Sequence, residues 1–164
     1  MIRTDSQCGF SMIEMLIALL VLAVGVYGQM ALQMNSISSN QSSYYRSQAA
    51  VIANEFAERM RLNSAEAGVN GTSYDSISID STSTYSKPTC YSTGCDADDQ
   101  VDADIYDLQE NLQNSIPSGS ATVTRDAGVS AQAVYNITIS WDIEDRKGLG
   151  NGSEVNQFSL DVGI

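Results

Sequence analysis

The sequence predicts an α+β fold in which a long amino-terminal helix packs on a small antiparallel β-sheet. Three features of the 164 residues predict it. An almost uninterrupted apolar stretch covers residues 10–32, a helical apolar stripe continues to residue 63, and residues 121–164 contain segments that alternate between apolar and polar side chains. Apolar residues three and four positions apart are typical of helices, and strict alternation is typical of strands with one buried face.

The composition of the chain excludes several function classes. The chain has 20 acidic and 8 basic residues, a net charge of −12, and no cluster of Lys and Arg. Since nucleic-acid-binding proteins neutralise phosphates with basic patches, we expect no nucleic-acid partner. Histidine is absent, which excludes Ser-His-Asp and Cys-His catalysis and the common His-containing zinc sites. We therefore expect neither an enzyme nor a bound cofactor or metal.

The apolar stretch 10–32 is predicted to cross a membrane. A helix of this length spans about 34 Å, against roughly 30 Å for the hydrocarbon core of a bilayer, and Glu14 is its only charged residue. A cleaved secretory signal is one alternative, but its apolar region is usually shorter and ends in a small-x-small cleavage site. A buried helix of a soluble domain is the other, but the rest of the chain has little apolar sequence to enclose it. We favour the membrane anchor.

The residues before the anchor predict its orientation. Residues 1–9 carry Arg3 and the α-amino group against Asp5, a weak positive bias that keeps this segment in the cytoplasm. The residues after the anchor would then lie in the bacterial periplasm, where disulfides form and persist.

A short motif at the start of the anchor resembles a known processing signal, the class III signal of type IV prepilins and type II secretion pseudopilins. The residues that carry the resemblance are Gly9, Phe10, Ser11, Ile13 and Glu14, followed at once by the apolar run. It implies a pilin-like fold and a membrane-embedded prepilin peptidase that cuts between Gly9 and Phe10 and methylates the new amino group of Phe10. Residues 1–9 would be the leader peptide, and the cut would also remove Cys8.

Glu14 is the candidate assembly residue. A charged side chain inside a membrane segment costs roughly 2.5–3.5 kcal/mol on insertion scales, so it is a functional candidate by default. The resemblance implies that its partner is the amino group of Phe10 on a neighbouring subunit, a pair that would register one anchor helix against the next. The alternative is a carboxylate that reaches the membrane surface and has no role.

Residues 33–63 are predicted to continue the helix beyond the membrane. An apolar stripe at helical spacing contains Ala49, Ile52, Phe56 and Met60. The opposite face is charged, and the Asn and Gly residues within 63–71 are typical of a helix end. We therefore expect this half of the helix to pack on its own exported domain.

Two segments of this helix carry a second, narrower resemblance. Residues 40–49 and 55–63 are similar to the family of minor pilins called type IV pilus modification protein PilV, and smaller matches occur at residues 119–126 and 139–142. The resemblance implies other minor pilins, the major pilin and a pilus tip adhesin as candidate partners.

Residues 64–164 are predicted to form the exported globular domain. A helix is predicted over residues 102–116, where Ile105, Leu108, Leu112 and Ile116 form an apolar stripe. Strands are predicted at 76–80, 121–125, 135–143 and 158–164, with a polar, Gly-rich connection over 144–156. This pattern predicts an antiparallel sheet laid against the outer half of the long helix.

The pair Cys90 and Cys95 has two interpretations. Paired with each other, the cysteines close a short loop that stabilises the domain by roughly 2 kcal/mol. The pair could also be half of a metal site, but the chain has neither a second such pair nor a His to complete one. We favour the local disulfide.

Six aspartates also have two interpretations. Asp96, Asp98, Asp99, Asp102, Asp104 and Asp107 lie close together, and several occupy alternate positions somewhat like a calcium loop. Val101 replaces the Gly of an EF-hand loop and Asp107 replaces its final Glu, so the standard pattern fails. A solvated loop and helix start is the favoured interpretation.

Three function hypotheses remain after these observations. The leading one is a minor pilin that joins or primes the type IV pilus. It would be a single-pass inner-membrane protein with a cytoplasmic amino terminus and a periplasmic domain before assembly, and part of the pilus afterwards. A minor pseudopilin of type II secretion is the first alternative, and a membrane-anchored periplasmic binding module is the second.

Overall fold

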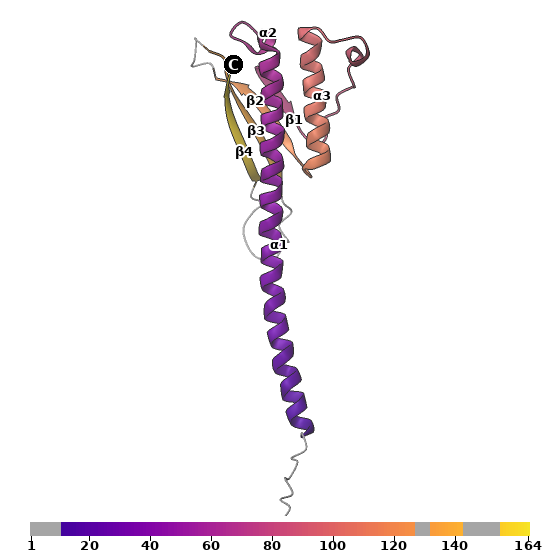
Figure 1. Cartoon of the computed structure of the whole chain (residues 1–164), viewed down its shortest axis with the longest axis vertical. Coiled ribbons are helices and arrows are strands. Elements are labelled where there is room, and N and C mark those ends of the chain that lie inside the picture. The colour runs from indigo at the N-terminus through magenta and orange to yellow at the C-terminus, as the bar shows by residue number, and fades with distance from the viewer. Residues whose placement is uncertain (1–10, 127–131, 143–154) are drawn as a thin grey trace, which may run out of the picture. The chain divides into compact units, whose positions relative to one another are not determined.

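One helix, α1, spans Met12–Leu62 in the computed structural model, which describes residues 11–126, 132–142 and 155–164 (Figure 1). The chain divides into two units, Met1–Gln41 and Ser42–Ile164, so that α1 begins in the first unit and ends in the second. All other elements lie in the second unit. In chain order they are α2 Ser64–Ala67, β1 Ser76–Ile79, η1 Thr89–Ser92, α3 Ala97–Ser115, β2 Ser120–Arg125, β3 Val134–Asp142 and β4 Val155–Gly163.

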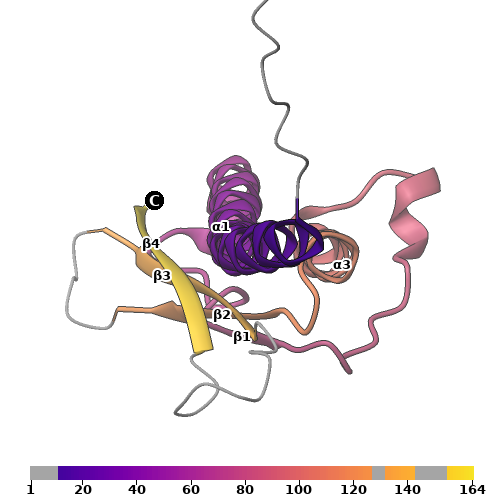
Figure 2. The same ribbon diagram turned by 90° about the horizontal axis from the view of Figure 1, so that it is seen from below.

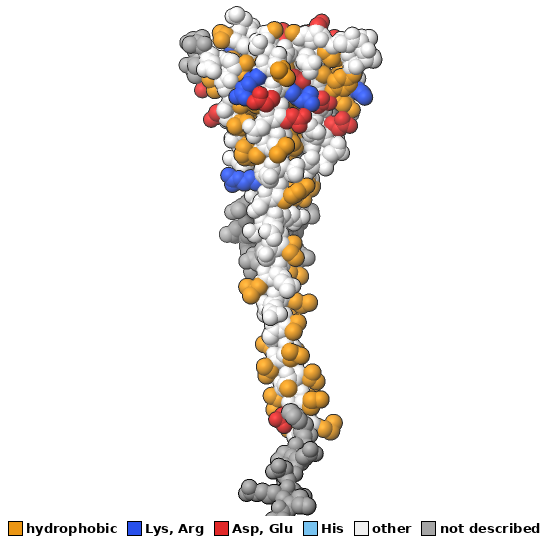
Figure 3. Space-filling model, viewed as in Figure 1, with side chains coloured by type: hydrophobic (Ala, Val, Ile, Leu, Met, Phe, Trp, Pro, Cys, Tyr) orange, Lys and Arg blue, Asp and Glu red, His pale blue; other side chains and the backbone are white. Residues whose placement is uncertain are grey.

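The first unit is helical from Met12 onward, as predicted for the apolar stretch. Every side chain that the structure describes between residues 11 and 41 is exposed, and Figure 3 shows hydrophobic side chains along this part of α1. The helix is long and apolar enough to cross a membrane, and none of its most apolar window is buried. No other described segment of this unit packs on it, so its apolar surface is available to lipid or to other helices.

The second unit contains a four-stranded antiparallel sheet in the order β1-β2-β3-β4 (Figure 2). Strand β3 is central and long, pairing with β2 from Tyr135 to Ser140 and with β4 over its whole length. The part of α1 that follows Ser42 lies on one face of the sheet, and α3 lies beside it. The α+β architecture that the sequence predicted, a long helix packed on a small antiparallel sheet, is therefore confirmed.

The core lies between this part of α1 and the sheet. The predicted apolar stripe of α1 is buried, with Phe56 at 2% and Met60 at 0% exposure. Alternate residues of β3 face it, and Tyr135, Ile137 and Ile139 are each 0% exposed. Burial of side chains of this size stabilises a fold by about 1.5–3 kcal/mol each. The two periodicities read from the sequence thus meet in a single core.

Several boundaries differ from the sequence-based predictions. Helix α3 begins at Ala97 and not at residue 102, because the Asp96 carboxylate accepts a hydrogen bond from the Asp99 amide (2.8 Å) and caps the helix five residues earlier. Strand β4 begins at Val155, inside the predicted connection. The short helices α2 and η1 have no apolar periodicity and were not predicted. Most of the predicted connection, and Ile143 at the end of the third predicted strand, lie outside the described residues.

Candidate functional site

The predicted processing signal lies at the border of the described residues. Gly9 and Phe10 are outside them, and α1 begins two residues later. Glu14 lies in the first helical turn, where its backbone N–H donates a hydrogen bond to the Ser11 carbonyl (3.0 Å). Its side chain is exposed, and an acidic group is favoured at the amino end of a helix.

The surface around Glu14 is apolar. Met12, Ile13 and Leu16 are 88%, 65% and 65% exposed, and the apolar surface continues along the helix to Leu32 at 74%. No Lys, Arg, Asp or Glu follows Glu14 until Arg46. A helix with apolar residues on all sides is stable only when lipid or other protein covers it. We call this apolar part of α1, residues 12–34, the assembly helix. Glu14 is its single carboxylate, and lipid or protein around the helix would exclude the water that normally hydrates that carboxylate.

In the second unit, the structure brings Asp104 of the acidic segment to a buried position. Its carboxylate is fully buried and accepts hydrogen bonds from the Tyr74 hydroxyl (2.6 Å) and the Gln100 amide (2.8 Å). The Asn63 side-chain amide donates to the Tyr74 hydroxyl (3.2 Å) and to the Ala97 carbonyl (2.7 Å). Burial, followed by the bond to Asp104, raises the pKa of Tyr74 above its ordinary value, so the phenol remains a donor.

Arg59 of α1 lies beside three carboxylates, of which Asp104 and Asp107 belong to α3 and Glu55 to α1 itself. Its guanidinium lies 2.8 Å from Asp107, 3.0 Å from Glu55 and 3.5 Å from Asp104. Burial alone would lower the pKa of Arg59, but the hydrogen bond to Glu55 and the charges of the carboxylates raise it. Tyr91 donates a further hydrogen bond to Asp107 (2.6 Å). This network, which we call the Arg59 cluster, fixes α3 against the end of α1.

The expectation of a solvated acidic segment is wrong at Asp104, and a calcium loop is not formed. Residues 97–115 are helical, so alternate aspartates point to different sides of α3 and do not converge on one point. Among the residues that the structure describes, no group of three or more His, Cys, Asp or Glu side chains could hold a metal ion. Asp104 lies four residues before Leu108 and three after Val101, both buried. That spacing was the signal in the sequence that could have placed Asp104 on the buried face.

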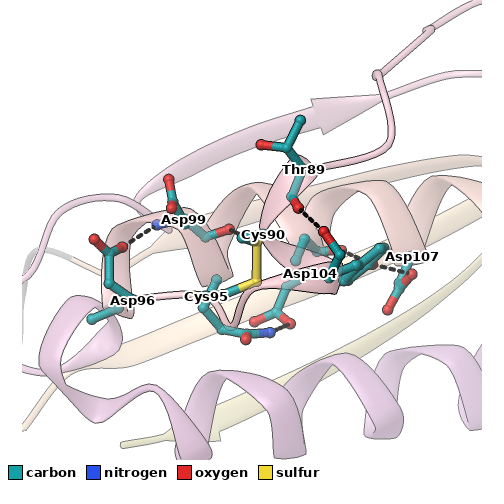
Figure 4. Close-up of a disulfide and its surroundings, with 12 residues drawn as sticks. Thr89, Cys90, Cys95, Asp96, Asp99, Asp104 and Asp107 are labelled. Atoms are coloured by element: carbon teal, nitrogen blue, oxygen red, sulfur yellow. Dashed lines mark hydrogen bonds between the residues drawn. A yellow bond between two sulfur atoms is a disulfide. The ribbon is translucent and has the colours of Figure 1, made fainter.

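The predicted disulfide between Cys90 and Cys95 is present (Figure 4). It joins η1 to the residue immediately before Asp96, the cap of α3, across a Cα–Cα distance of 4.8 Å. Cys90 is 5% exposed. The bridge therefore closes the short loop between η1 and α3 and restricts the conformation of the chain where α3 begins.

A groove at the end of α1 is the candidate site for the binding-module hypothesis. Arg59, Asn63 and Asp104 are among the residues that line it. Their polar groups already bond to one another or to Tyr74. The groove therefore presents groups that are already used for folding.

Two family models match the chain. Residues 31–106 match the model described as type IV pilin Tt1218, and residues 4–26 match the prokaryotic N-terminal methylation motif. The search of curated proteins and the search of solved structures each found no match. The first match covers the second half of α1, the disulfide and the start of α3, and the second covers the processing signal with Glu14. Together with the pilin-like α+β fold, these matches support a type IV pilin that carries a prepilin methylation signal, of a family that is in general structural and not enzymatic.

Proposed function

We propose that the chain is a minor pilin of the type IV pilus, similar to the PilV modification proteins, which joins or primes pilus assembly after processing by prepilin peptidase. The observation that carries the proposal is the assembly helix, an exposed apolar surface with one carboxylate directly after a methylation motif. An apolar helix of this kind can leave the lipid only by exchanging it for other apolar helices. The bundled core of a filament offers such an exchange.

In this proposal, residues 1–9 are the leader, residues 10–32 cross the inner membrane, residues 33–63 continue the helix in the periplasm and residues 64–164 form the periplasmic domain. Cleavage between Gly9 and Phe10 creates an amino group at the start of the assembly helix. The peptidase then methylates it.

Glu14 supplies register in the assembled state. It lies four residues after Phe10, about one turn along a helix. A carboxylate in an apolar environment is stabilised chiefly by an opposite charge, and the amino group of Phe10 on a neighbouring subunit is the charge that cleavage provides. The pair would form only when two helices have the correct stagger.

The exported domain supplies lateral contacts and carries no chemistry in this proposal. The Arg59 cluster holds α3 against α1, and the disulfide ties η1 to the start of α3, so a partner would meet a preformed surface. Preformed surfaces lose little conformational entropy on binding. The proposed partners are other minor pilins, the major pilin and a tip adhesin.

The choice of a pilus over a type II secretion pseudopilus depends on the resemblance of residues 40–49 and 55–63 to PilV proteins. Part of the second segment has a structural use, because Arg59 and Asn63 hold the domain together. Residues 40–47 have no fully buried side chain, and Tyr45 is the partly buried residue among them that packs against the core. The exposed residues of this segment are therefore the part of the resemblance that favours a shared role in the pilus.

Processing is tested by the intact mass of the chain isolated from membranes and from sheared pili. The proposal expects a chain that begins at Phe10 and carries one added methyl group. A Gly9→Val variant is the control and should keep residues 1–9, because the added side chain obstructs the peptidase site. A wild-type chain that keeps its original amino terminus would contradict the pilin function and indicate a plain membrane anchor.

A further inference from the structure

Among the described residues, no strand pairs with the outer backbone edge of β4. This strand is the last in the order β1-β2-β3-β4 and has nine residues, against four in β1 at the opposite edge (Figure 2). An open strand edge presents unpaired N–H and C=O groups and is a template for pairing with another chain.

The hydrogen bonds of the sheet show which residues of β4 face outward. The Ile164 amide donates to the Ala133 carbonyl (2.8 Å), and the Asp126 amide donates to the Val134 carbonyl (2.8 Å). In an antiparallel sheet these bonds alternate along each strand, so the even-numbered residues of β4 bond to β3. The backbone groups of Gln157, Ser159 and Asp161 therefore point to the open edge.

This edge has few of the devices that usually prevent pairing. The residues of β4 include no Pro, Lys or Arg, and Asp161 is its one charged residue. The Asp161 carboxylate already accepts a hydrogen bond from the Asn136 amide (2.7 Å). Proteins commonly protect exposed edges with Lys, Pro or a bulge, and β4 instead remains regular over its whole length.

The two faces of β4 define the side chains of a suitable partner. Phe158 and Leu160 lie on the core face but are only partly buried. Gln157, Ser159 and Asp161 lie on the other face and are exposed. A fifth strand would complete the cover over Phe158 and Leu160 if its apolar residues alternated with polar ones.

The negative net charge of the chain favours a basic partner strand over a second copy of the chain. The chain has a net charge of −12, so a second copy would be repelled on approach, whereas a basic segment would be attracted. We propose that the β4 edge binds an extended, basic segment of another protein by strand addition, with its apolar residues beside Phe158 and Leu160 and a Lys or Arg near Asp161. This inference is independent of the proposed pilin function, because the binding uses only the unit Ser42–Ile164.

The decisive variant is Ser159→Pro, with Ser159→Ala as its matched control. Proline removes the outward N–H of residue 159 and leaves every bond between β3 and β4 in place, because Ser159 does not donate to β3. Both variants lose the side-chain hydrogen bond between Ser159 and Thr138 (2.9 Å). The comparison therefore isolates the outward backbone donor. Fluorescence of Trp141, the single tryptophan, checks that both variants are folded.

The probe is a synthetic nine-residue peptide in which Val alternates with Lys and Thr, and a second peptide has Glu in place of Lys. The full chain is held in nanodiscs of zwitterionic lipid, binding is measured by fluorescence anisotropy, and amide exchange is followed by mass spectrometry. We expect saturable binding of the Lys peptide, at least tenfold weaker binding of the Glu peptide, and slower exchange at Gln157, Ser159 and Asp161. Ser159→Pro should weaken binding at least tenfold and Ser159→Ala less than threefold.

Three results would overturn the inference. The first is an absence of saturable binding or of slower exchange in β4. The second is equal binding by Ser159→Pro and Ser159→Ala, or equal binding of the Lys and Glu peptides. The third is a dimer of the chain without peptide that Ser159→Pro abolishes, which would assign the edge to a second copy.

Discussion

Replacement of Asp104 by Ala tests whether the Arg59 cluster holds the exported domain together. Asp104 is 0% exposed and accepts hydrogen bonds from Tyr74 and Gln100, while Arg59 lies 3.5 Å away. Without the carboxylate, the hydroxyl of Tyr74 loses its acceptor in a buried position. In the variant, the guanidinium of Arg59 still pairs with Glu55 and Asp107. Arg59 therefore loses one of its three carboxylate partners.

The expected loss of stability follows from these contacts. A hydrogen bond to a charged group contributes about 1.5–3 kcal/mol, and removal of one partner of a buried pair costs about 3–5 kcal/mol. We discount the Arg59 contribution because its side chain is 32% exposed. Asp104→Ala should therefore lower the free energy of unfolding by about 2–4 kcal/mol. Asp104→Asn keeps an acceptor for Tyr74 and should lose about half as much.

The assay is urea unfolding of the full chain in detergent micelles, followed by the fluorescence of Trp141, which is 3% exposed. Glu110→Ala is the control, because Glu110 is an exposed residue of the same helix and its loss should change stability by less than about 0.5 kcal/mol. An Asp104→Ala variant as stable as Glu110→Ala would refute the structural role of the Arg59 cluster.

Three further predictions concern the assembly helix, the core and the disulfide. Glu14→Ala should leave cleavage after Gly9 largely intact but reduce the amount of the chain in sheared pili, with Glu14→Asp as the charge-preserving control. Normal piliation by Glu14→Ala, measured by immunoblot, would contradict the register role. Burial, followed by the charge of Asp75, raises the pKa of Tyr135 to about 12, whereas an unfolded Tyr titrates near 10. The phenol's contribution to stability should therefore be complete below pH ~10 and be lost as the pH rises toward the folded pKa. Tyr135→Phe should remove the loss of stability at alkaline pH that is due to this phenol. If the ultraviolet titration of the tyrosines is the same in this variant as in the wild type, the raised pKa does not belong to Tyr135. Replacement of Cys90 and Cys95 by Ser should lower the free energy of unfolding by about 2 kcal/mol in urea, and a change within error would mean that the bridge does not stabilise the domain.

The sequence predicted the elements whose apolar residues are periodic. The apolar stripe of α1 is buried as expected, as Phe56 and Met60 show. The alternating residues of β3 are buried as well: Tyr135, Ile137 and Ile139. These patterns are readable because each element buries a single face. They also determine how the elements pack, since the stripe and the alternating face must cover each other.

The parts that the sequence did not predict depend on polar contacts between distant residues. Asp104 shares the helical spacing of Val101 and Leu108, but its partners Tyr74, 30 positions away, and Arg59 are too distant in the sequence to be read from that spacing. The turn after β1 forms because the Asp80 carboxylate accepts bonds from the backbone amides of Thr82 and Ser83, both 2.8 Å. Such bonds have no periodicity, so residues 64–100 contained little signal. The roles of Gly9, Phe10 and Glu14 remain predictions.

The central claim, a minor pilin that acts in pilus assembly, is tested most directly by a clean gene deletion with surface pili and secreted exoproteins quantified from the same culture. The account predicts loss of pili with normal secretion, and recovery of pili when the wild-type gene is returned. Loss of secretion with normal pili would contradict the claim and assign the protein to the type II pseudopilins.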